Sequence, residues 1–270
     1  MSTGISLSTI GVDAPTYVEA ARRAEAAGFS AVWCYDHLSG VVLRGDSALD
    51  VWAVLGAVST ATTDVAVGPL VANATTRHPA QLAVAAATIQ SLSAGRLKLG
   101  LGAGAGPGSP FAVEWEMFLL EPRPAGERRA RLEEVVAFLR ALWDGAERYD
   151  GTWAGFADVR GVIMPSPPPP IILGANGPRL AEVAGRVADG VNFHAAEEDL
   201  AGLVATVQGA AEVAGRHAPP ASVEGPFEPE WVDQGSPTRQ RLADHGVAEV
   251  MVAWRAELGL DRIDEASRWL

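Results

Sequence analysis

Short apolar strands alternate with amphipathic helices along nearly the whole chain. Repeated strand–helix units are typical of a parallel sheet that is covered by helices. Eight such units in 270 residues predict one α/β domain over residues 1–270, a (β/α)8 TIM barrel, because that fold needs roughly 250 residues. The expected strands lie at 4–8, 31–35, 65–71, 97–101, 171–173, 191–193, 222–225 and 249–254, and the seventh has the weakest pattern.

Capping residues and apolar stripes mark the expected helices. Asp13 suits the N-cap of the first helix, and Gly28 follows its last residue. Pro79 begins another helix, and 126–142 has the clearest apolar stripe. A small hairpin over 148–162 lies outside the repeating pattern. The other expected helices are 49–61, 179–187, 199–215, 238–245 and one that begins at Asp261.

Composition restricts the classes of partner. The formal net charge is −12 and the isoelectric point is near 4.9, which argues against binding to nucleic acid or to an anionic membrane surface. Cys34 is the only cysteine, so no internal disulfide is expected, and the start of the chain lacks the features of a signal peptide. No apolar stretch approaches the roughly 20 residues of a membrane helix. We therefore expect a cytoplasmic protein with no nucleic-acid or membrane partner.

An acid and a histidine directly follow the strand at 31–35. Catalytic groups of TIM barrels come from the carboxyl ends of the strands, so Asp36 and His37 are expected at the mouth of the barrel. Side chains alternate between the two faces of a strand, which places Trp33, Tyr35 and His37 on one side. The two residues alone are equally compatible with a structural role, in which Asp36 caps a turn and His37 is a surface or core histidine.

Two glycine-rich segments follow later strands. The segment 174–177 precedes Pro178 in the first turn of a helix, so free N–H groups there predict an anion seat, although a tight turn would need the same glycines. The run 102–108 has the spacing of a dinucleotide fingerprint, but Pro107 and Pro110 occupy the place where a helix would begin. We interpret these glycines instead as a surface on which a flat ring can lie.

Several standard chemistries have no support in the sequence. It contains no G-x-S-x-G elbow, no H-E-x-x-H motif and no paired cysteines for zinc. The single lysine, Lys98, lies near the start of its strand, away from the mouth where a Schiff base would need it. Hydrolase, kinase and Schiff-base mechanisms are therefore disfavoured.

Three motifs together resemble the bacterial luciferase-like superfamily (LLM class), whose members are flavin- or deazaflavin-dependent oxidoreductases on a TIM barrel. The motifs are AVWCYDHL at 31–38, VGPLVANATTRHPAQLAVAAATIQSLSAGRLKLGLGAG at 67–104 and PPPPIILGANGPRLAEVAGRVADGV at 167–191. The Asp-His pair is similar to the branch that uses coenzyme F420, an 8-hydroxy-5-deazaflavin. The region 219–235, where longer members carry an insertion, is reduced, which implies either a more open pocket or no functional consequence.

The resemblance implies roles for individual residues. His37 would be the acid–base group, and Asp36 would help to hold it or the ring. The family carries a non-proline cis peptide in the third strand, and the matching bond is Leu70–Val71. Some dehydrogenases of the branch have a glutamate where this chain has Ala105, so their proton relay is not reproduced. The implied cofactor contacts are Leu70, Val71, Asn73, Ala103, Gly104 and, for the phosphate, Ala175, Asn176 and Gly177; no metal is implied.

The resemblance also implies a reaction. We expect hydride transfer between F420 and a small organic substrate. One alternative is a monooxygenase that uses dioxygen and FMN reduced by a partner reductase, and a second is a non-catalytic flavin-binding barrel. Superfamily members are often dimers, and a homodimer would be compatible with Trp231 and Trp269 on the surface.

Overall fold

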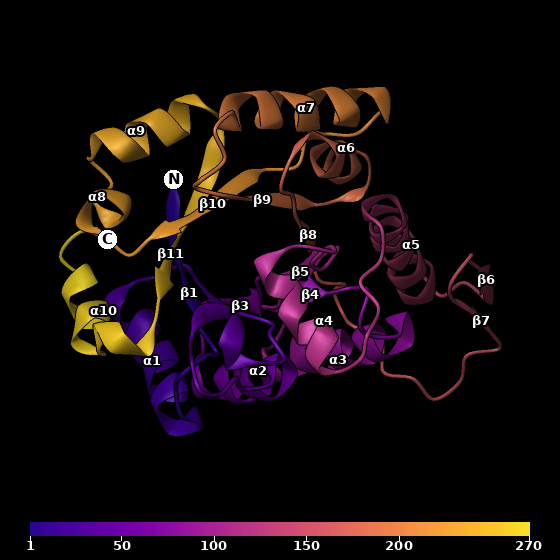
Figure 1. The fold of residues 1–270 in the computed structure, drawn as a ribbon, viewed down its shortest axis with the longest axis horizontal. Helices are drawn as coiled ribbons and strands as arrows, with labels where there is room; N and C mark the ends of the chain where they lie inside the picture. Colours follow the sequence, from indigo (N-terminus) through magenta and orange to yellow (C-terminus); the bar gives the residue numbers. More distant parts are fainter.

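A parallel sheet curls into a barrel at the centre of the molecule (Figure 1). The computed structural model describes residues 1–270. Its barrel strands are β1 (Ser2–Leu7), β2 (Ala31–Cys34), β3 (Ala66–Pro69), β4 (Ala72–Asn73), β5 (Leu99–Gly102), β8 (Ile171–Gly174), β9 (Gly190–His194), β10 (Ala221–Pro226) and β11 (Val247–Trp254). Neighbours in the sheet follow the order β3-β2-β1-β11-β10-β9-β8-β5-β4.

The strands β3 and β4 are two parts of one strand position, because only Leu70 and Val71 separate them. β3 pairs with β2, whereas β4 pairs with β5. A parallel bridge between Val67 and Leu97 also joins β3 to the segment before β5. Nine strands therefore fill eight positions of a closed ring, and the predicted (β/α)8 barrel is confirmed.

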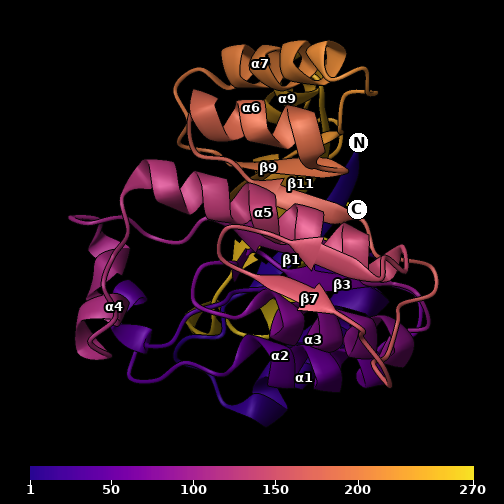
Figure 2. The same cartoon turned by 90° about the vertical axis from the view of Figure 1, so that its right-hand side faces the viewer.

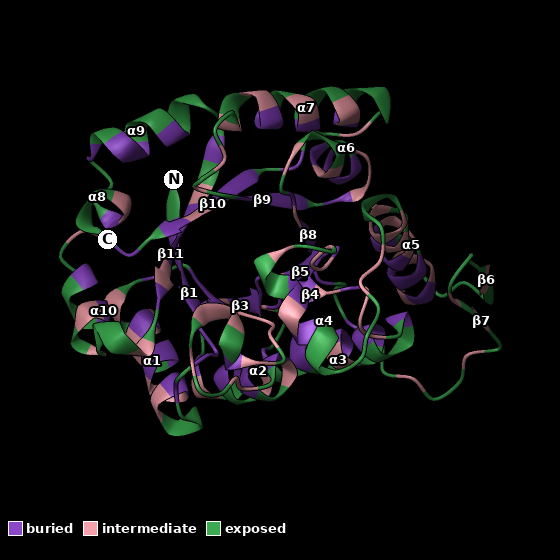
Figure 3. Ribbon diagram, in the orientation of Figure 1, coloured by how far each residue is buried: buried purple, intermediate pink, exposed green.

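Helices surround this barrel and bury the face that they turn toward it (Figure 3). The longer ones are α1 (Ala14–Ala27), α2 (Val51–Ala61), α3 (Pro79–Leu92), α5 (Ala125–Trp143), α6 (Pro178–Val187), α7 (Leu200–Val213), α9 (Pro237–Asp244) and α10 (Asp261–Ala266). The shorter elements are α4 (Val113–Met117), α8 (Pro229–Val232), the 3-10 helices η1 (Gly40–Leu43), η2 (Pro110–Ala112) and η3 (Ala256–Leu258), and the hairpin β6 (Arg148–Asp150) and β7 (Gly155–Ala157). No helix has both the length and the apolar character that crossing a bilayer requires.

The main core lies between the strands and the helices and contains 55 buried residues. Helix α1 shows how the sequence forms these elements. Asp13 accepts a hydrogen bond from the backbone N–H of Thr16 at 2.9 Å, Tyr17 is completely buried, and Gly28 ends the helix with a φ of 99°. The N-cap and the glycine stop that the sequence predicts for this helix are therefore confirmed.

A smaller cluster of five buried residues fills the inside of the barrel and comprises Ala31, Trp33, Leu70, Ile172 and Met251. Trp33 points inward because side chains alternate along β2, and its neighbours Val32 and Cys34 pack outward in the main core. The same alternation continues past the end of β2 to Tyr35 and His37, whose rings meet edge to face at 6.3 Å. This pattern brings His37 to the mouth of the barrel, as predicted.

One expectation about the C-terminal third is confirmed and another needs correction. The predicted seventh strand, which has the weakest pattern in the sequence, is present as β10, which has six residues and pairs with both β9 and β11. Trp231 and Trp269, expected on the surface, are half-buried against the core. Gly225 makes room for the first of them, because a Cβ at Gly225 would lie 2.4 Å from the Trp231 ring.

Candidate active site

A cleft of about 700 Å³ opens at the carboxyl ends of the barrel strands. Residues at the ends of β2, β5, β8, β9 and β10 line it, together with α4 and the loop before it. Figure 2 shows α4 at the end of the molecule opposite the two chain termini. Eight of the predicted site residues line this cleft, namely Asp36, His37, Leu70, Val71, Asn73, Ala103, Gly104 and Asn176.

The floor of the cleft is formed where the third barrel strand is interrupted. The peptide bond between Leu70 and Val71 is cis, as predicted. Val71 then projects between glycines, since a Cβ at Gly102 would lie 2.5 Å from its Cγ2 atom and one at Gly174 would lie 3.1 Å from it. Side chains at these two positions would collide with Val71, so the glycines allow it to stand at the cleft, where it is half-buried.

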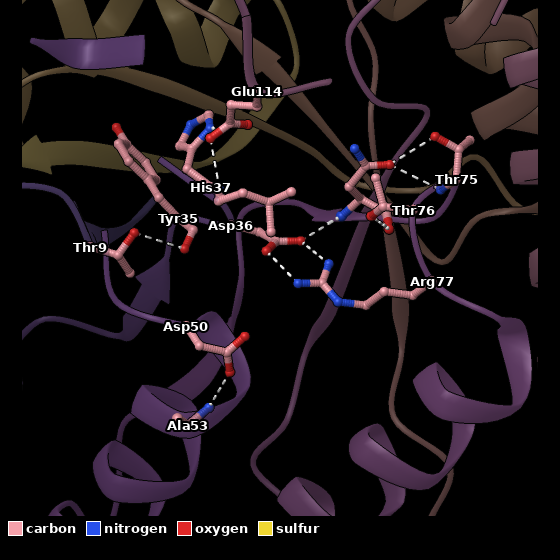
Figure 4. A network of polar contacts seen from close by, with 12 residues as sticks. Thr9, Tyr35, Asp36, His37, Asp50, Ala53, Thr75, Thr76, Arg77 and Glu114 are labelled. Carbon is pink, nitrogen blue, oxygen red and sulfur yellow. Dashed lines mark hydrogen bonds and ion pairs between the residues drawn. The ribbon is translucent and has the colours of Figure 1, made fainter. Parts of the chain in front are cut away.

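Asp36 connects the end of β2 to the loop that follows the Leu70–Val71 bond through hydrogen bonds. Its Oδ1 atom accepts a hydrogen bond from Arg77 Nη2 at 2.8 Å (Figure 4). Its Oδ2 atom pairs with Arg77 Nη1 and accepts from the backbone N–H of Asn73 at 2.8 Å. The Asp36 side chain is only 4% exposed. Both carboxylate oxygens therefore bind this loop, and neither is hydrogen-bonded to His37.

Glu114, in α4, is the carboxylate beside His37. Its Oε2 atom lies 3.3 Å from His37 Nδ1 (Figure 4). Its Oε1 atom accepts from the backbone N–H groups of Leu38 at 2.7 Å and Ser39 at 2.9 Å. The ring of Phe111 stacks on the imidazole, with 5.8 Å between centroids and 18° between planes. The imidazole is thereby held by a carboxylate at Nδ1 and by an aromatic ring on its face.

A third carboxylate, that of Glu224, reaches the cleft from β10. Its Oε1 atom accepts hydrogen bonds from the hydroxyls of Ser6 and Tyr35, the latter at 2.7 Å. Burial, with Glu224 beside it, raises the pKa of Tyr35 well above its ordinary range, so the phenol keeps its proton. The other oxygen of Glu224, Oε2, accepts no hydrogen bond from the protein.

Arg77, Glu114 and Glu224 are contacts that the sequence analysis missed. Glu114 stands alone in the apolar run 111–115, and Glu224 stands inside a strand. A carboxylate in such surroundings needs a partner, because burying an unpaired charge is costly. A glutamate among apolar residues was therefore the sequence pattern that could have identified Glu114 and Glu224 as site residues. Nothing in the sequence distinguishes Arg77 from the other arginines of the chain.

The predicted phosphate seat lies at the N-terminus of α6. Ala175 is completely buried, and its N–H group donates to the carbonyl of Asn192 at 2.9 Å. Asn176 lines the main cleft, whereas Gly177 and Pro178 line a neighbouring groove. No side chain caps this helix, so the N–H groups of its first turn keep free hydrogen-bonding capacity. Phosphate binding at this place stays a prediction.

Arg128, in α5, reaches the glycine turn after β5. Its Nη1 atom pairs with the carbonyl of Gly104, and its Nε atom donates to the carbonyl of Arg123 at 3.1 Å. Burial, with Arg129 nearby, lowers the pKa of Arg128, although a guanidinium stays charged at neutral pH. Arg128 is the only arginine or lysine that lines the cleft.

Comparison with known proteins identifies relatives of this chain. Residues 3–226 match the profile of the family described as luciferase-like monooxygenase. The F420-dependent glucose-6-phosphate dehydrogenase of Beutenbergia cavernae is 37% identical over 171 residues, which cover 62% of this chain and 48% of that protein. The F420-dependent hydroxymycolic acid dehydrogenase of Mycobacterium tuberculosis is 32% identical over 215 residues, which cover 79% of this chain and 58% of that protein. The chain thus spans about half the length of the curated relatives it matches.

A solved structure shares the fold over the whole chain. It is an F420-dependent secondary alcohol dehydrogenase in complex with an F420-acetone adduct, and it superposes with a TM-score of 0.87. The superposition covers 100% of this chain and 98% of that one at 18% sequence identity, which shows the fold alone. The family profile covers most of the chain and confirms the resemblance of the three motifs, so the chain belongs to the luciferase-like monooxygenase family.

Proposed function

We propose that the protein is an F420-dependent oxidoreductase that transfers a hydride between the coenzyme and a small organic substrate. The observation that carries this proposal is the position of His37, which lines the same cleft as Val71 and Gly104, the residues expected beside the ring. The names of the two relatives, both F420-dependent dehydrogenases, support the choice of coenzyme. An acid–base group thus lies in one cleft with a surface suited to a flat redox ring.

The cleft residues fit a planar ring with an anionic tail. Val71 offers an apolar surface between Gly102 and Gly174, and a side chain at either glycine would collide with Val71. A Cβ at Gly104 would likewise lie 2.8 Å from the amide of Asn73. The uncapped N-terminus of α6 supplies hydrogen-bond donors for a phosphate, and Arg128 adds positive charge to the cleft. The cleft therefore offers an apolar surface for the ring of such a coenzyme and hydrogen-bond donors for its phosphate.

Each predicted residue has a place in this proposal. Asp36 acts indirectly, because its bonds to Arg77 and to the Asn73 N–H fix the loop on which the ring would rest. Ala175 supports the turn before α6 through its bond to Asn192. The groups that would contact the ring are Leu70, Val71, Asn73, Ala103 and Gly104, and those that would hold the phosphate are Asn176 and Gly177.

When bound, F420 supplies the carbon that accepts or releases the hydride. The protein positions the substrate carbon and manages one proton. When a hydroxyl is oxidised, its carbon gives up a hydrogen with the bonding electron pair, a C=O bond forms, and the O–H proton passes to His37. In the reverse direction His37 returns that proton to the carbonyl oxygen. A positioned histidine contributes about 10²–10⁴-fold to such a reaction.

Glu114 determines which nitrogen of His37 exchanges the proton. Its carboxylate, 3.3 Å from Nδ1, can only accept a hydrogen bond, so Nδ1 carries a proton and Nε2 serves the substrate. The same carboxylate binds the backbone of Leu38 and Ser39, so the ring and its loop are fixed together. Ala105 carries no carboxylate, and Glu114 supplies one to His37 from α4 instead.

Anaerobic titrations with F420 and with FMN test the coenzyme. We expect F420 to bind and its visible absorption band to bleach when substrate is oxidised. Oxygen uptake with reduced FMN and a reductase would favour the monooxygenase alternative, and binding without turnover would favour a non-catalytic barrel. His37→Ala should lower turnover by about 10²–10⁴-fold and leave coenzyme affinity unchanged. Full turnover by that variant would remove His37 from the proposed role.

A homodimer is part of this proposal because of the family resemblance alone. Trp231 and Trp269 no longer support it, since both are half-buried within one chain. Light scattering of the purified protein tests the assembly directly, and a monomer at micromolar concentration would contradict it. A flavin or deazaflavin reductase that supplies the reduced coenzyme is a further partner in this proposal.

A further inference from the structure

We infer that the cleft takes an uncharged alcohol or ketone with an apolar chain, and that it does not take a phosphorylated sugar. This inference rests on the proposed function, because it names the substrate class of the same site. Two independent observations carry it. One is the charge of the cleft lining, and the other is an exposed apolar surface that continues from the cleft.

The charges of the cleft oppose a second anion. Glu114 and Glu224 line it without an arginine or lysine partner, whereas Asp36, which also lines it, is neutralised by its ion pair with Arg77, and Arg128 is the only arginine or lysine of the lining. The single lysine of the chain, Lys98, pairs with Glu249 at 3.2 Å near the amino ends of the strands, far from this lining. A substrate phosphate would therefore face carboxylates without a cation of its own, which is unfavourable in a partly desolvated site.

Arg128 is not available as the cation for a substrate phosphate. Its Nη1 and Nε atoms are bound to the carbonyls of Gly104 and Arg123, which turns the guanidinium toward the glycine turn. A Cβ at Gly106 would lie 2.7 Å from its Nη2 atom, so the group lies directly on the backbone. The anionic tail of the coenzyme would also compete for this charge. Arg255 is exposed at the end of β11 but does not line the cleft.

An exposed apolar surface adjoins the cleft on the side of α4, and we call it the apolar shelf. Leu119 is 91% exposed and Phe118 is 55% exposed. The turn that carries them directly follows Trp115, which lines the cleft, and it is closed by a hydrogen bond from the Leu120 N–H group to the carbonyl of Trp115 at 2.8 Å. The shelf consists of the exposed side chains of Leu38, Phe111, Met117, Phe118, Leu119 and Leu120.

Phe111 connects this shelf to the reacting groups. It lines the cleft, is 41% exposed, and stacks on the imidazole of His37. A substrate oxygen near His37 would therefore have apolar surface leading outward from its carbon chain. Clustered exposed apolar residues next to a cleft are typical of a binding surface, whereas single ones are ordinary. The occupant is accordingly the apolar part of the substrate.

A homologous series of secondary alcohols, from 2-propanol to 2-nonanol, tests this inference on the F420-loaded enzyme. We expect kcat/KM to rise by up to about fourfold per added methylene, the limit set by transfer of apolar surface from water. Glucose-6-phosphate should be neither a substrate nor an inhibitor. The double variant Phe118→Ser and Leu119→Ser should flatten the rise, so that its kcat/KM for 2-nonanol approaches its own value for 2-propanol. Val213→Ser is the matched control, because Val213 is 90% exposed on α7.

Saturation-transfer NMR with the corresponding 2-alkanones gives a readout that needs no turnover. Binding should strengthen with chain length in the wild type and in Val213→Ser, and should not strengthen in the shelf variant. A flat series in the wild type, or an unchanged series in the shelf variant, overturns the inference. Turnover of glucose-6-phosphate that Arg255→Ala abolishes also overturns it, as does a shelf variant that changes only the oligomeric state. Absence of F420 binding in the titration would instead remove the proposed function.

Discussion

The Oε2 atom of Glu114 lies 3.3 Å from Nδ1 of His37, although 77 positions separate the two residues in the chain. The other oxygen of the same carboxylate binds the two backbone N–H groups that follow His37. One side chain of α4 therefore fixes both the imidazole and the loop that carries it. The proposed proton exchange depends on this arrangement.

Replacing Glu114 separates its effect on the ring from its effect on the loop. Glu114→Gln keeps an oxygen for the Leu38 and Ser39 N–H groups but presents an amide NH₂ to Nδ1 of His37, which favours the opposite tautomer. We expect turnover to fall by about tenfold or more with coenzyme affinity and stability retained. Glu114→Ala should in addition lower the free energy of unfolding by about 1–3 kcal/mol. Steady-state kinetics and urea unfolding check both, and a fully active Gln variant would contradict the assignment.

The ion pair between Asp36 and Arg77 should be important for stability, because both side chains are largely buried, with 4% and 17% exposure. Asp36→Asn leaves the guanidinium without its partner and should lower the free energy of unfolding by about 3 kcal/mol. Adding Arg77→Gln should recover part of that loss, which a double-mutant cycle in urea measures. Arg148→Gln is the control, since both members of its pair with Asp150 are 68% exposed, and we expect no measurable change. Equal effects at the two pairs would refute the assignment.

The glycine turn after β5 offers a matched pair of substitutions. Gly104 and Gly108 have φ values of 71° and 76°, so an alanine at either position carries a similar backbone cost of about 1 kcal/mol. Only at Gly104 would the new Cβ meet another group, the Asn73 amide at 2.8 Å. Gly104→Ala should therefore weaken F420 binding about tenfold, or about 1.4 kcal/mol, relative to Gly108→Ala. Fluorescence titration with F420 measures the affinity of each variant. Equal affinities of the two variants would argue against a ring in contact with this turn.

Stability should decrease in alkaline solution. Burial raises the pKa of the Cys34 thiol to about 12, and burial likewise raises the pKa of Tyr17. An unfolded thiol loses its proton near pH 8.5–9 while the folded one keeps it, so the unfolded state binds fewer protons and the free energy of unfolding falls with rising pH. Between about pH 9 and 10 the expected contribution of Cys34 is about 1 kcal/mol per pH unit. Urea unfolding of Cys34→Ala should show a flatter pH dependence, and parallel curves would contradict this.

The barrel and the Asp-His pair could be predicted because they follow from local patterns. Alternation along β2 decides that Trp33 and His37 share a side, and capping residues decide where α1 begins and ends. The cis bond at Leu70–Val71 came from the family resemblance, and the structure confirms it. Eight of the predicted site residues line the cleft for the same reason, since strand ends converge in a barrel.

The partners of these residues could not be predicted, because they come from distant parts of the chain. Arg77 is 41 positions from Asp36, Glu114 is 77 from His37, and Glu224 is 189 from Tyr35. Pairings of this kind depend on how elements dock rather than on local preference. The short helix α4 was also missed, since the prolines and glycines before it read as an irregular loop. The apolar surface beside it could not be anticipated either.

The single lysine at the base of the barrel has a practical consequence. Lys98 directly precedes β5, so the amine of this lysine lies where that strand enters the barrel. Coupling of Lys98 to a sensor chip would therefore attach the molecule by the end of the barrel opposite the cleft. The cleft would then face the flowing solution in copies attached in this way, which suits direct measurement of ligand binding.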